Sequence, residues 1–350
     1  MAIQNRKKID EPKKSKRIGA PTQERQSSKF LEVIKKFIYT WGTLVVLFGL
    51  FLIFSLINPK FASLENIQII ANRSAVPFVL SMGMTFVIIQ GGIDLSVPGI
   101  MSVGSLVVAL LVTNNRNSNH LGFLGVLIAV VVGLILGFAN GFVHTKFKIP
   151  SFMATLGIFS FGYGIAMLLS GGSPPIILDH GLRNLGIGQL FGIGWLVYLS
   201  LGIVGLSYFL QKYTKFGRYA YVIGGNEEIA IQCGINVPFY KTMIFMYAGA
   251  LFALGGVMES ARLGLGHSLI GAGQDFATIT AVVVGGTLLS GGRGGVINSV
   301  IGVLIMSVLA NGFIFIGVNP YIQNAVQGLI ILIAVIATTW QHRERLRIMK

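Results

Sequence analysis

The chain has 350 residues, of which 53% are hydrophobic and only 11% are charged. Soluble proteins carry about 25% charged residues, so the composition excludes an ordinary soluble fold and predicts an all-α protein that crosses a membrane many times. The net charge of +15 would suit a nucleic-acid partner, but almost half of it lies in the first 36 residues, just before the first membrane-length apolar run, so we expect no nucleic-acid binding.

The first 36 residues hold eleven Lys or Arg and four acidic residues, with no apolar periodicity before Phe30. This composition predicts a basic, disordered cytosolic tail (1–36) that lies near anionic lipid headgroups. The apolar run that follows is too long for the hydrophobic region of a signal peptide, and no small-residue cleavage site follows it. We therefore expect it to remain as the first membrane helix.

A helix needs about 20 apolar residues to cross the hydrocarbon core. The sequence predicts about ten such helices in a transmembrane domain spanning 37–340, followed by a cytosolic tail at 341–350. The second span contains Arg73 and Pro77, so its first turns are expected to be broken or re-entrant. The predicted spans are 37–57, 67–90, 97–113, 122–143, 152–170, 192–210, 242–260, 276–290, 296–317 and 322–339.

Between the second and third spans lies the run Gly91-Gly92-Ile93-Asp94-Leu95-Ser96-Val97. Asp94 is the only ionisable residue between Arg73 and Arg116, and a carboxylate between apolar helices needs a partner, a helix end or a water-filled cavity. It can accept hydrogen bonds from the free N–H groups of Ser96 and Val97, or it can contact a solute; the sequence leaves both roles open. The candidate pathway residues are Asp94, Gly92 and Ser96, with Asn72 in the preceding span.

The fourth span carries Gly133, Gly137 and Gly141 on one helical face, a pattern that predicts close packing against another helix. Orientation follows from the basic residues, which favour the cytosolic side. With the N-terminus inside, all but five of the 27 Lys and Arg residues fall on the inside. Both termini are therefore predicted to be cytosolic.

Two connecting segments are long. The outer one, 171–191, contains Asp179 and Arg183 and is a candidate surface for a partner protein. The inner one, 211–241, is predicted to form one or two short helices around 227–233 on the cytosolic surface.

Catalytic motifs are absent from the sequence. The glycine run 291–295 lacks the Gly-Lys-Ser/Thr of a nucleotide-binding loop, and no His pair has metal-ligand spacing. We therefore expect no enzyme activity, no metal and no cofactor in this chain. The single cysteine, Cys233, cannot form an intramolecular disulfide. Besides Asp94, only Glu259 and Asp275 lie near membrane depth, and few acids at depth disfavour an ion-coupled secondary carrier, which is the different-class alternative.

Four ordered motifs resemble those of the monosaccharide ABC-importer permeases, the ribose, xylose, arabinose and galactose type. They are the Gly-Gly-Ile-Asp-Leu-Ser-Val run at 91–97, Lys-Ile-Pro-Ser-Phe-Met-Ala-Thr-Leu-Gly at 148–157, the inner segment 216–235 and the glycine-rich stretch 281–294. The resemblance covers roughly residues 40 to 340. Pro98 replaces the family's usual glycine, and Ile229 and Cys233 stand where Ala and Ser are commoner, so the substrate class stays open among sugars, nucleosides, branched-chain amino acids and autoinducer-type sugars.

The resemblance implies a type II-like ABC importer permease in the bacterial cytoplasmic (inner) membrane. It implies a second permease, identical or paralogous, a tandem ATP-binding subunit that holds ATP and Mg, and an extracytoplasmic sugar-binding protein. It also implies that the inner segment couples this chain to the ATP-binding subunit through Gly224, Asn226, Glu227, Glu228, Gly234 and Ile235.

Overall fold

The computed structural model describes residues 41–319, 322, 325–326, 328–330 and 332. The tails predicted at 1–36 and 341–350 lie outside this part of the chain, as does most of the tenth predicted span. The described elements are the helix Trp41–Ile57, the 3₁₀ helix η1 (Pro59–Ala62), α2 (Leu64–Ile89), α3 (Val97–Leu111), α4 (Phe123–Phe147), α5 (Ser151–Ser170), α6 (His180–Ile187), the hairpin of β1 (Gln189–Leu190) and β2 (Ile193–Gly194), α7 (Trp195–Tyr213), α8 (Lys215–Gly225), α9 (Glu227–Gln232), α10 (Val237–Leu263), α11 (Gln274–Val284) and α12 (Val296–Phe315).

The expectation of an all-α membrane protein is confirmed for the described residues. Five helices (α2, α4, α5, α10 and α12) are long and apolar enough to cross a membrane, and three shorter apolar helices coincide with further predicted spans. The short helices expected within 211–241 are present as α8 and α9.

The break expected in the second span is wrong, because α2 runs without interruption for 26 residues through Arg73 and Pro77. A proline removes one intrahelical hydrogen bond, here to the carbonyl of Arg73. The helix tolerates this loss because it packs against α7, α10 and α12, which together bury most of it. The Arg73 side chain is exposed, so its charge is not buried in the helix bundle.

The eighth predicted span, 276–290, differs from the structure more deeply. Its helix, α11, has only 11 residues, and the chain reaches it through a non-helical stretch, 264–273, that runs back along α3. A Cβ on Gly271 would lie 2.7 Å from the Cα of Pro98, at the start of α3. The His267 N–H donates to Ser105 Oγ, in the middle of α3, at 3.0 Å. This segment is therefore a short helix preceded by a non-helical stretch of turns.

The glycine face predicted on α4 packs against α10. A Cβ at Gly133, Gly137 or Gly141 would overlap the α10 chain between Thr242 and Ala253. Polar pairs join other helices in the interior: Asn311 Nδ2 donates to Asn66 Oδ1 at 2.7 Å, and Thr85 Oγ1 donates to Ser299 Oγ at 2.6 Å. Close backbone approach and buried polar pairs are the contacts that hold helices together in lipid.

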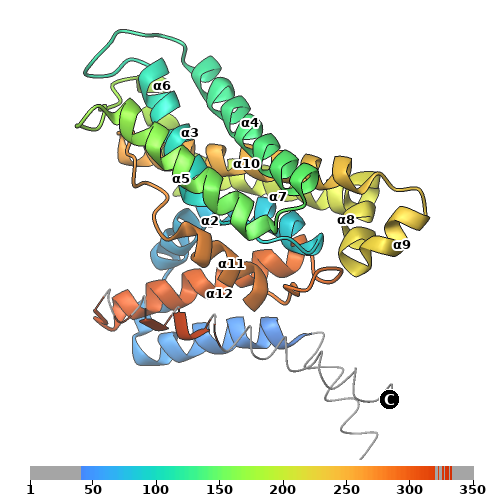
Figure 1. Ribbon diagram of the computed structural model, residues 1–350. Coiled ribbons are helices and arrows are strands. Elements are labelled where there is room, and N and C mark those ends of the chain that lie inside the picture. Colours follow the sequence, from blue (N-terminus) through green and yellow to red (C-terminus); the bar gives the residue numbers. More distant parts are fainter. Residues whose placement is uncertain (1–40, 320–321, 323–324, 327, 331, 333–350) are drawn as a thin grey trace, which may run out of the picture. The chain divides into compact units, whose positions relative to one another are not determined.

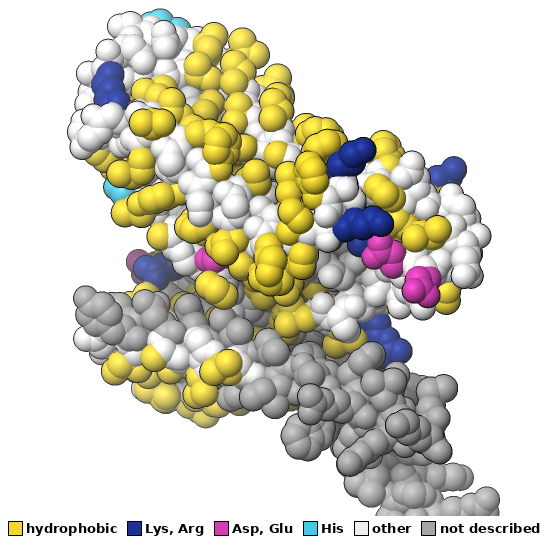
Figure 2. Space-filling view, in the orientation of Figure 1, with side chains coloured by type: hydrophobic (Ala, Val, Ile, Leu, Met, Phe, Trp, Pro, Cys, Tyr) yellow, Lys and Arg dark blue, Asp and Glu magenta, His cyan; other side chains and the backbone are white. Residues whose placement is uncertain are grey.

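The helix α10 connects the two ends of the helix bundle. Figure 1 shows α8 and α9 at the end where α10 begins, and α6 near the end where α10 stops. Figure 2 shows hydrophobic side chains over the visible faces of α4 and α5, and a group of basic and acidic side chains where α8 and α9 lie. Exposed apolar residues on α4 and α5 include Phe123, Leu127, Ile135, Phe161 and Leu168. Their exposure is what a lipid-facing surface requires.

Candidate functional site

The chain between α2 and α3 forms a non-helical junction of residues 90–96. Gln90 closes α2, Gly91 turns the chain with a φ of +85°, and Pro98 lies in the first turn of α3. A positive φ favours glycine, and proline suits the first turn of a helix because its missing N–H has no partner there. The junction therefore stops one helix and starts the next at a fixed place.

Asp94 lies at the centre of this junction and is fully buried. Its Oδ1 atom accepts hydrogen bonds from the Ser96 backbone N–H at 2.8 Å and from Ser96 Oγ at 2.5 Å. Ser96 Oγ in turn accepts from Asn140 Nδ2 of α4 at 2.8 Å. In the described part of the chain, Oδ2 has no hydrogen-bond partner and Val97 N–H does not donate to Asp94. The carboxylate is thus held on one side only.

The first residues of α5 hold the same junction from the other side. The Ile93 N–H donates to Ser151 Oγ at 2.9 Å, and the Leu95 N–H donates to Thr155 Oγ1 at 3.0 Å. Backbone N–H groups buried without water need such partners. Ser151 and Thr155, from the motif at 148–157, therefore supply the hydrogen-bond acceptors that these non-helical N–H groups need.

A half-open cavity of about 300 Å³ lies beside the junction, and Gly92 lines it together with His144 and Lys241. Gln90 also lines it, and both amide atoms of this buried side chain lack partners among the described residues. Lys241 Nζ forms an ion pair with Glu227 Oε2 at 2.7 Å, which connects the cavity wall to the first residue of α9.

The structure does not gather the four candidate pathway residues in one place. Asp94 and Ser96 are fully buried within the junction, and Gly92 faces the cavity beside it. Asn72 lies in the first third of α2, where its Oδ1 accepts from the Gly194 N–H of β2 at 2.8 Å. Because a helix rises about 1.5 Å per residue, the part of α2 that follows Asn72 keeps this residue far from the junction.

The end of α8 touches the junction backbone directly. Gly224 packs so closely that a Cβ there would overlap the carbonyl oxygen of Ile89, the last residue of α2. The Gly292 N–H donates to that same carbonyl at 2.9 Å. A Cβ on Gly291, whose φ is +83°, would lie 2.9 Å from both the Gly224 carbonyl oxygen and the Gly91 nitrogen. Three chain segments thus meet through backbone atoms alone.

Hydrogen bonds tie α8 to the glycine-rich loop at a second point. Tyr221 Oη donates to the Gly294 carbonyl at 2.7 Å, and Gln211 Nε2 donates to Tyr221 Oη at 2.5 Å. The Val296 N–H, at the start of α12, donates to Gln211 Oε1 at 2.7 Å. The ends of α7 and α8 are therefore fixed to the loop that precedes α12.

The short helix α9 has a buried side and an exposed side. Asn226 Oδ1 caps it by accepting from the Ile229 N–H at 3.0 Å, while Ala230 packs into a small cluster with Ile223 and Val237, against which Ile235 lies. Gly234 ends the turn after α9 with a φ of +76°. The exposed side carries Glu228, Ile229 and Ile231.

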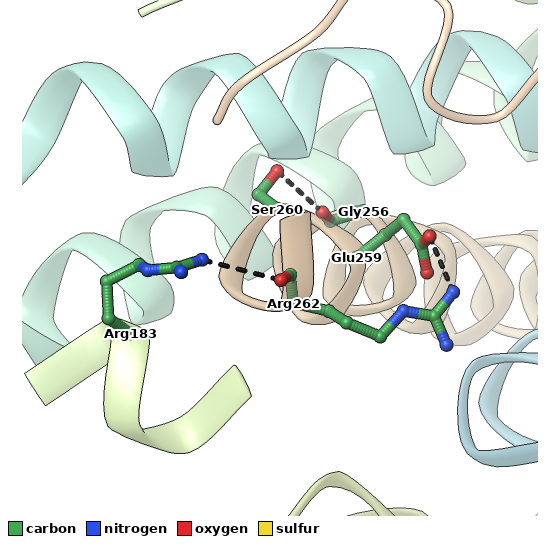
Figure 3. Close-up of polar contacts among 5 residues, drawn as sticks. All are labelled: Arg183, Gly256, Glu259, Ser260 and Arg262. Atoms are coloured by element: carbon green, nitrogen blue, oxygen red, sulfur yellow. Dashed lines mark hydrogen bonds and ion pairs between the residues drawn. The ribbon is translucent and has the colours of Figure 1, made fainter. Parts of the chain in front are cut away.

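At the C-terminal end of α10, the charged side chains form hydrogen bonds or an ion pair within the chain (Figure 3). Asp179 Oδ1 caps α6 by accepting from the Leu182 N–H at 2.8 Å. Arg183 reaches across from α6 to the Ala261 and Arg262 carbonyls at the end of α10, and Arg262 forms an ion pair with Glu259 at 2.6 Å. These contacts fasten α6 to α10.

Sequence reasoning did not find the contact between α8 and the glycine-rich loop. The glycine run at 291–295 lacks a nucleotide-binding motif and belongs in part to a stretch that resembles importer permeases, but neither feature predicts a contact with α8. Gln211 and Tyr221 lie far from Gly294 in sequence and carry no pattern that would pair them. Only the fold brings them together.

Comparison with known proteins places these features in a family. A model of the family described as "Branched-chain amino acid transport system / permease component" matches residues 66–335. The chain is 38% identical over 298 residues to the ribose import permease protein RbsC of Bacillus subtilis, covering 84% of this chain and 91% of that protein. It is 35% identical over 318 residues to the probable ABC transporter permease protein YphD of Escherichia coli (91% and 94%). It is 33% identical over 309 residues to the galactose/methyl galactoside import permease protein MglC of Escherichia coli (84% and 92%). No solved structure matches.

The close approach at Gly224 predicts a large difference between two neighbouring substitutions. Gly224→Ala forces a methyl group against the Ile89 carbonyl and should destabilise the protein by about 1–3 kcal/mol, the usual cost of overpacking. Gly225→Ala is the matched control, because no atom lies within 4 Å of its added Cβ. Thermal unfolding of the two purified variants in detergent measures the difference, and equal unfolding midpoints would disprove the contact.

The hydrogen bonds of Asp94 predict which substitutions the junction tolerates. Asp94→Asn keeps an oxygen that can accept from Ser96, so folding should persist. Asp94→Leu leaves the buried Ser96 N–H without its acceptor and should cost about 1–3 kcal/mol. The yield of monodisperse protein and its unfolding midpoint test this order, which would be refuted if the Asn variant were the less stable.

Proposed function

Because this chain belongs to the family of permease components typified by branched-chain amino acid transport systems, we propose that it is the membrane subunit of an ATP-driven importer for a monosaccharide. The observation that carries the sugar assignment is the similarity to named ribose and galactose import permeases, which extends over most of both chains at 33–38% identity. The chain itself is a transport component, and the energy of ATP enters through a separate subunit.

The importer would need three partners. A tandem ATP-binding subunit supplies the hydrolysis of ATP with Mg, an extracytoplasmic binding protein delivers the sugar, and a second permease, identical or paralogous, completes the membrane pathway. A monosaccharide is a small, strongly hydrated solute, so a pathway shared between two permeases can enclose it without exposing it to lipid.

The coupling surface lies on α9 and the adjoining turn. Glu228 and Ile229 point outward from α9 and are free to meet a soluble subunit, whereas Glu227 is engaged by Lys241. Asn226, Gly234 and Ile235 fix the shape of this surface by capping, turning and packing. Gly224 connects it to the end of α2. A push on α9 therefore has a backbone route to the Asp94 junction.

The junction is best assigned to shaping the pathway. Asp94 and Ser96 anchor the broken helix, and Gly92 lets the cavity approach the backbone. Asn72 would act at the far end of α2, where it holds the hairpin β1–β2. None of these roles requires Asp94 to touch the sugar.

We place the chain in the bacterial cytoplasmic membrane with both termini inside and ten crossings. Relatives in the same family are bacterial import permeases. The support for the orientation is the excess of Lys and Arg in the segments on the side of α8 and α9.

The second candidate substrate is a branched-chain amino acid, because the matching family model carries that description. Nucleosides and autoinducer-type sugars are further candidate substrates. The experiment below separates these classes.

Reconstituted transport tests the proposal. In liposomes that contain this permease, its ATP-binding subunit and its binding protein, we expect uptake of ribose or galactose in the presence of ATP and none with a non-hydrolysable analogue. Uptake of leucine and not of either sugar would assign the chain to amino acid transport. Uptake by the permease alone, driven by an ion gradient, would contradict the whole proposal.

Orientation can be tested on the unmodified chain, because Cys233 is exposed and is the only cysteine. A membrane-impermeant maleimide should label Cys233 in inverted membrane vesicles and leave it unlabelled in right-side-out vesicles. Labelling of right-side-out vesicles would place α9 outside and would refute the proposed topology. A Cys233→Ser variant provides the control for background labelling.

A further inference from the structure

A second cavity, distinct from the one beside Asp94, lies where α11 begins. It has a volume of about 330 Å³ and is half open. Its walls come from the start of α3, from the middle of α5 and from the non-helical stretch that leads into α11. The volume falls at the small end of the range of about 300–1,000 Å³ for ligand pockets, which suits a small solute.

Part of the chain beside this cavity is not helical, although it lies among the helices of the bundle. The stretch 264–273 runs beside α3 without forming a helix: it ends in a series of turns, in which the Ile270 N–H donates to the His267 carbonyl at 3.3 Å and the Ala272 N–H donates to the Leu269 carbonyl at 3.0 Å. The helix α11 starts only at Gln274. Phe159 and Tyr163, which line the cavity, lie near the middle of the 20-residue α5. Non-helical backbone at membrane depth is tolerated where it is buried in protein or lines a water-filled space, and discontinuous helices commonly form transport sites.

The lining combines aromatic rings with a few polar groups. Phe159, Tyr163 and Phe276 supply the rings, and those of Phe159 and Tyr163 are 6.2 Å apart. Asp275 and the buried Ser268 supply oxygens. Asp275 lies in the first turn of α11, where its carboxylate accepts from the backbone N–H groups of Asp275 and Phe276, and among the described residues it forms no ion pair. Ring faces can pack on the C–H faces of a sugar, while carboxylate and hydroxyl oxygens can bind its hydroxyl groups.

Asp275 differs from Glu259 in its ion pairing. Glu259 is neutralised by Arg262 at 2.6 Å, whereas no ion pair of Asp275 exists in the part of the chain described. A carboxylate without a cation is costly against lipid but not against water or a hydroxylated solute. Asp275, Ser268 and Tyr163 therefore give this largely apolar cavity a polar side at which a hydroxylated ligand can bind.

The lining also discriminates between substrate classes. No Lys, Arg or His is among the residues that line this cavity. An amino acid would find a partner for its ammonium group at Asp275 but no cation for its carboxylate. A neutral sugar has no ammonium or carboxylate group that needs an ionic partner, and any one of its hydroxyl groups can donate a hydrogen bond to Asp275.

We propose that this cavity, with Asp275 and the rings of Tyr163 and Phe276, is the site through which a neutral monosaccharide passes within the membrane. The inference rests on the proposed function, and it moves direct substrate contact from Asp94 to the start of α11. The two sites are joined along α3, which begins at the junction and carries Pro98 into the cavity wall.

The test compares uptake with ATP hydrolysis in the reconstituted complex, using ribose and galactose as probes. Asp275→Asn should lower sugar uptake about tenfold or more, as expected for the loss of a charge-assisted hydrogen bond, while hydrolysis stimulated by the binding protein stays within about twofold of wild type. Glu259→Gln is the matched control and should keep wild-type uptake, because that acid does not line the cavity.

A second measurement does not depend on Asp275. In an active Cys233→Ser background, Ala272→Cys places a thiol in the cavity lining and Ser118→Cys places one in an exposed connecting loop. A bulky thiol reagent should stop uptake by the first variant and not by the second, and millimolar ribose or galactose should slow the reaction at position 272 only.

The outcomes separate the two proposals. If the wild-type complex takes up neither sugar, the proposed function fails. If it takes up sugar, and both Asp275→Asn and the labelled Ala272→Cys variant transport at wild-type rates, the sugar does not pass this cavity and the inference is overturned.

Discussion

The arrangement depends on one backbone contact, in which Gly224 at the end of α8 lies against the carbonyl of Ile89 at the end of α2. The contact is possible only because glycine has no Cβ, and Gly291 and Gly292 complete it from the loop before α12. Backbone atoms packed this closely cannot slide independently as flexible side chains do. Movement of α8 must therefore displace the end of α2, the loop, or both.

From this contact, a series of contacts leads inward from α8 and α9 in two short steps. The first step reaches residues 90–96, which α4 and α5 hold through Asn140, Ser151 and Thr155. The second follows α3 to the cavity at the start of α11. The buried carboxylate of Asp94 accepts hydrogen bonds through Oδ1, and within the described part of the chain its Oδ2 has no partner.

The sequence predicted the helical architecture well, because apolar runs of membrane length and glycine faces such as Gly133 to Gly141 are local signals. It failed at Pro77, where packing on several sides keeps α2 continuous despite the lost hydrogen bond. It also extended the eighth span too far, to residue 290, whereas α11 ends at Val284, because an apolar composition does not reveal where the turns after a helix begin.

For the site, the sequence found Asp94 and its Ser96 donor but not the residues that meet them in space. Gln211, Tyr221 and Gly294 are brought together only by the fold, and so are Tyr163 and Asp275. Such sets come from distant parts of the chain and carry no common period or spacing.

The central claim is that movement of α8 and α9, in the inner segment 211–241, moves the junction at residues 90–96. Its most direct test is the reactivity of a thiol at position 93, which lines the cavity beside Asp94, in the reconstituted complex of an active Cys233→Ser, Ile93→Cys variant. The account predicts that binding of ATP to the partner subunit changes the rate of modification by a water-soluble reagent. An unchanged rate in a complex that still transports sugar would contradict it.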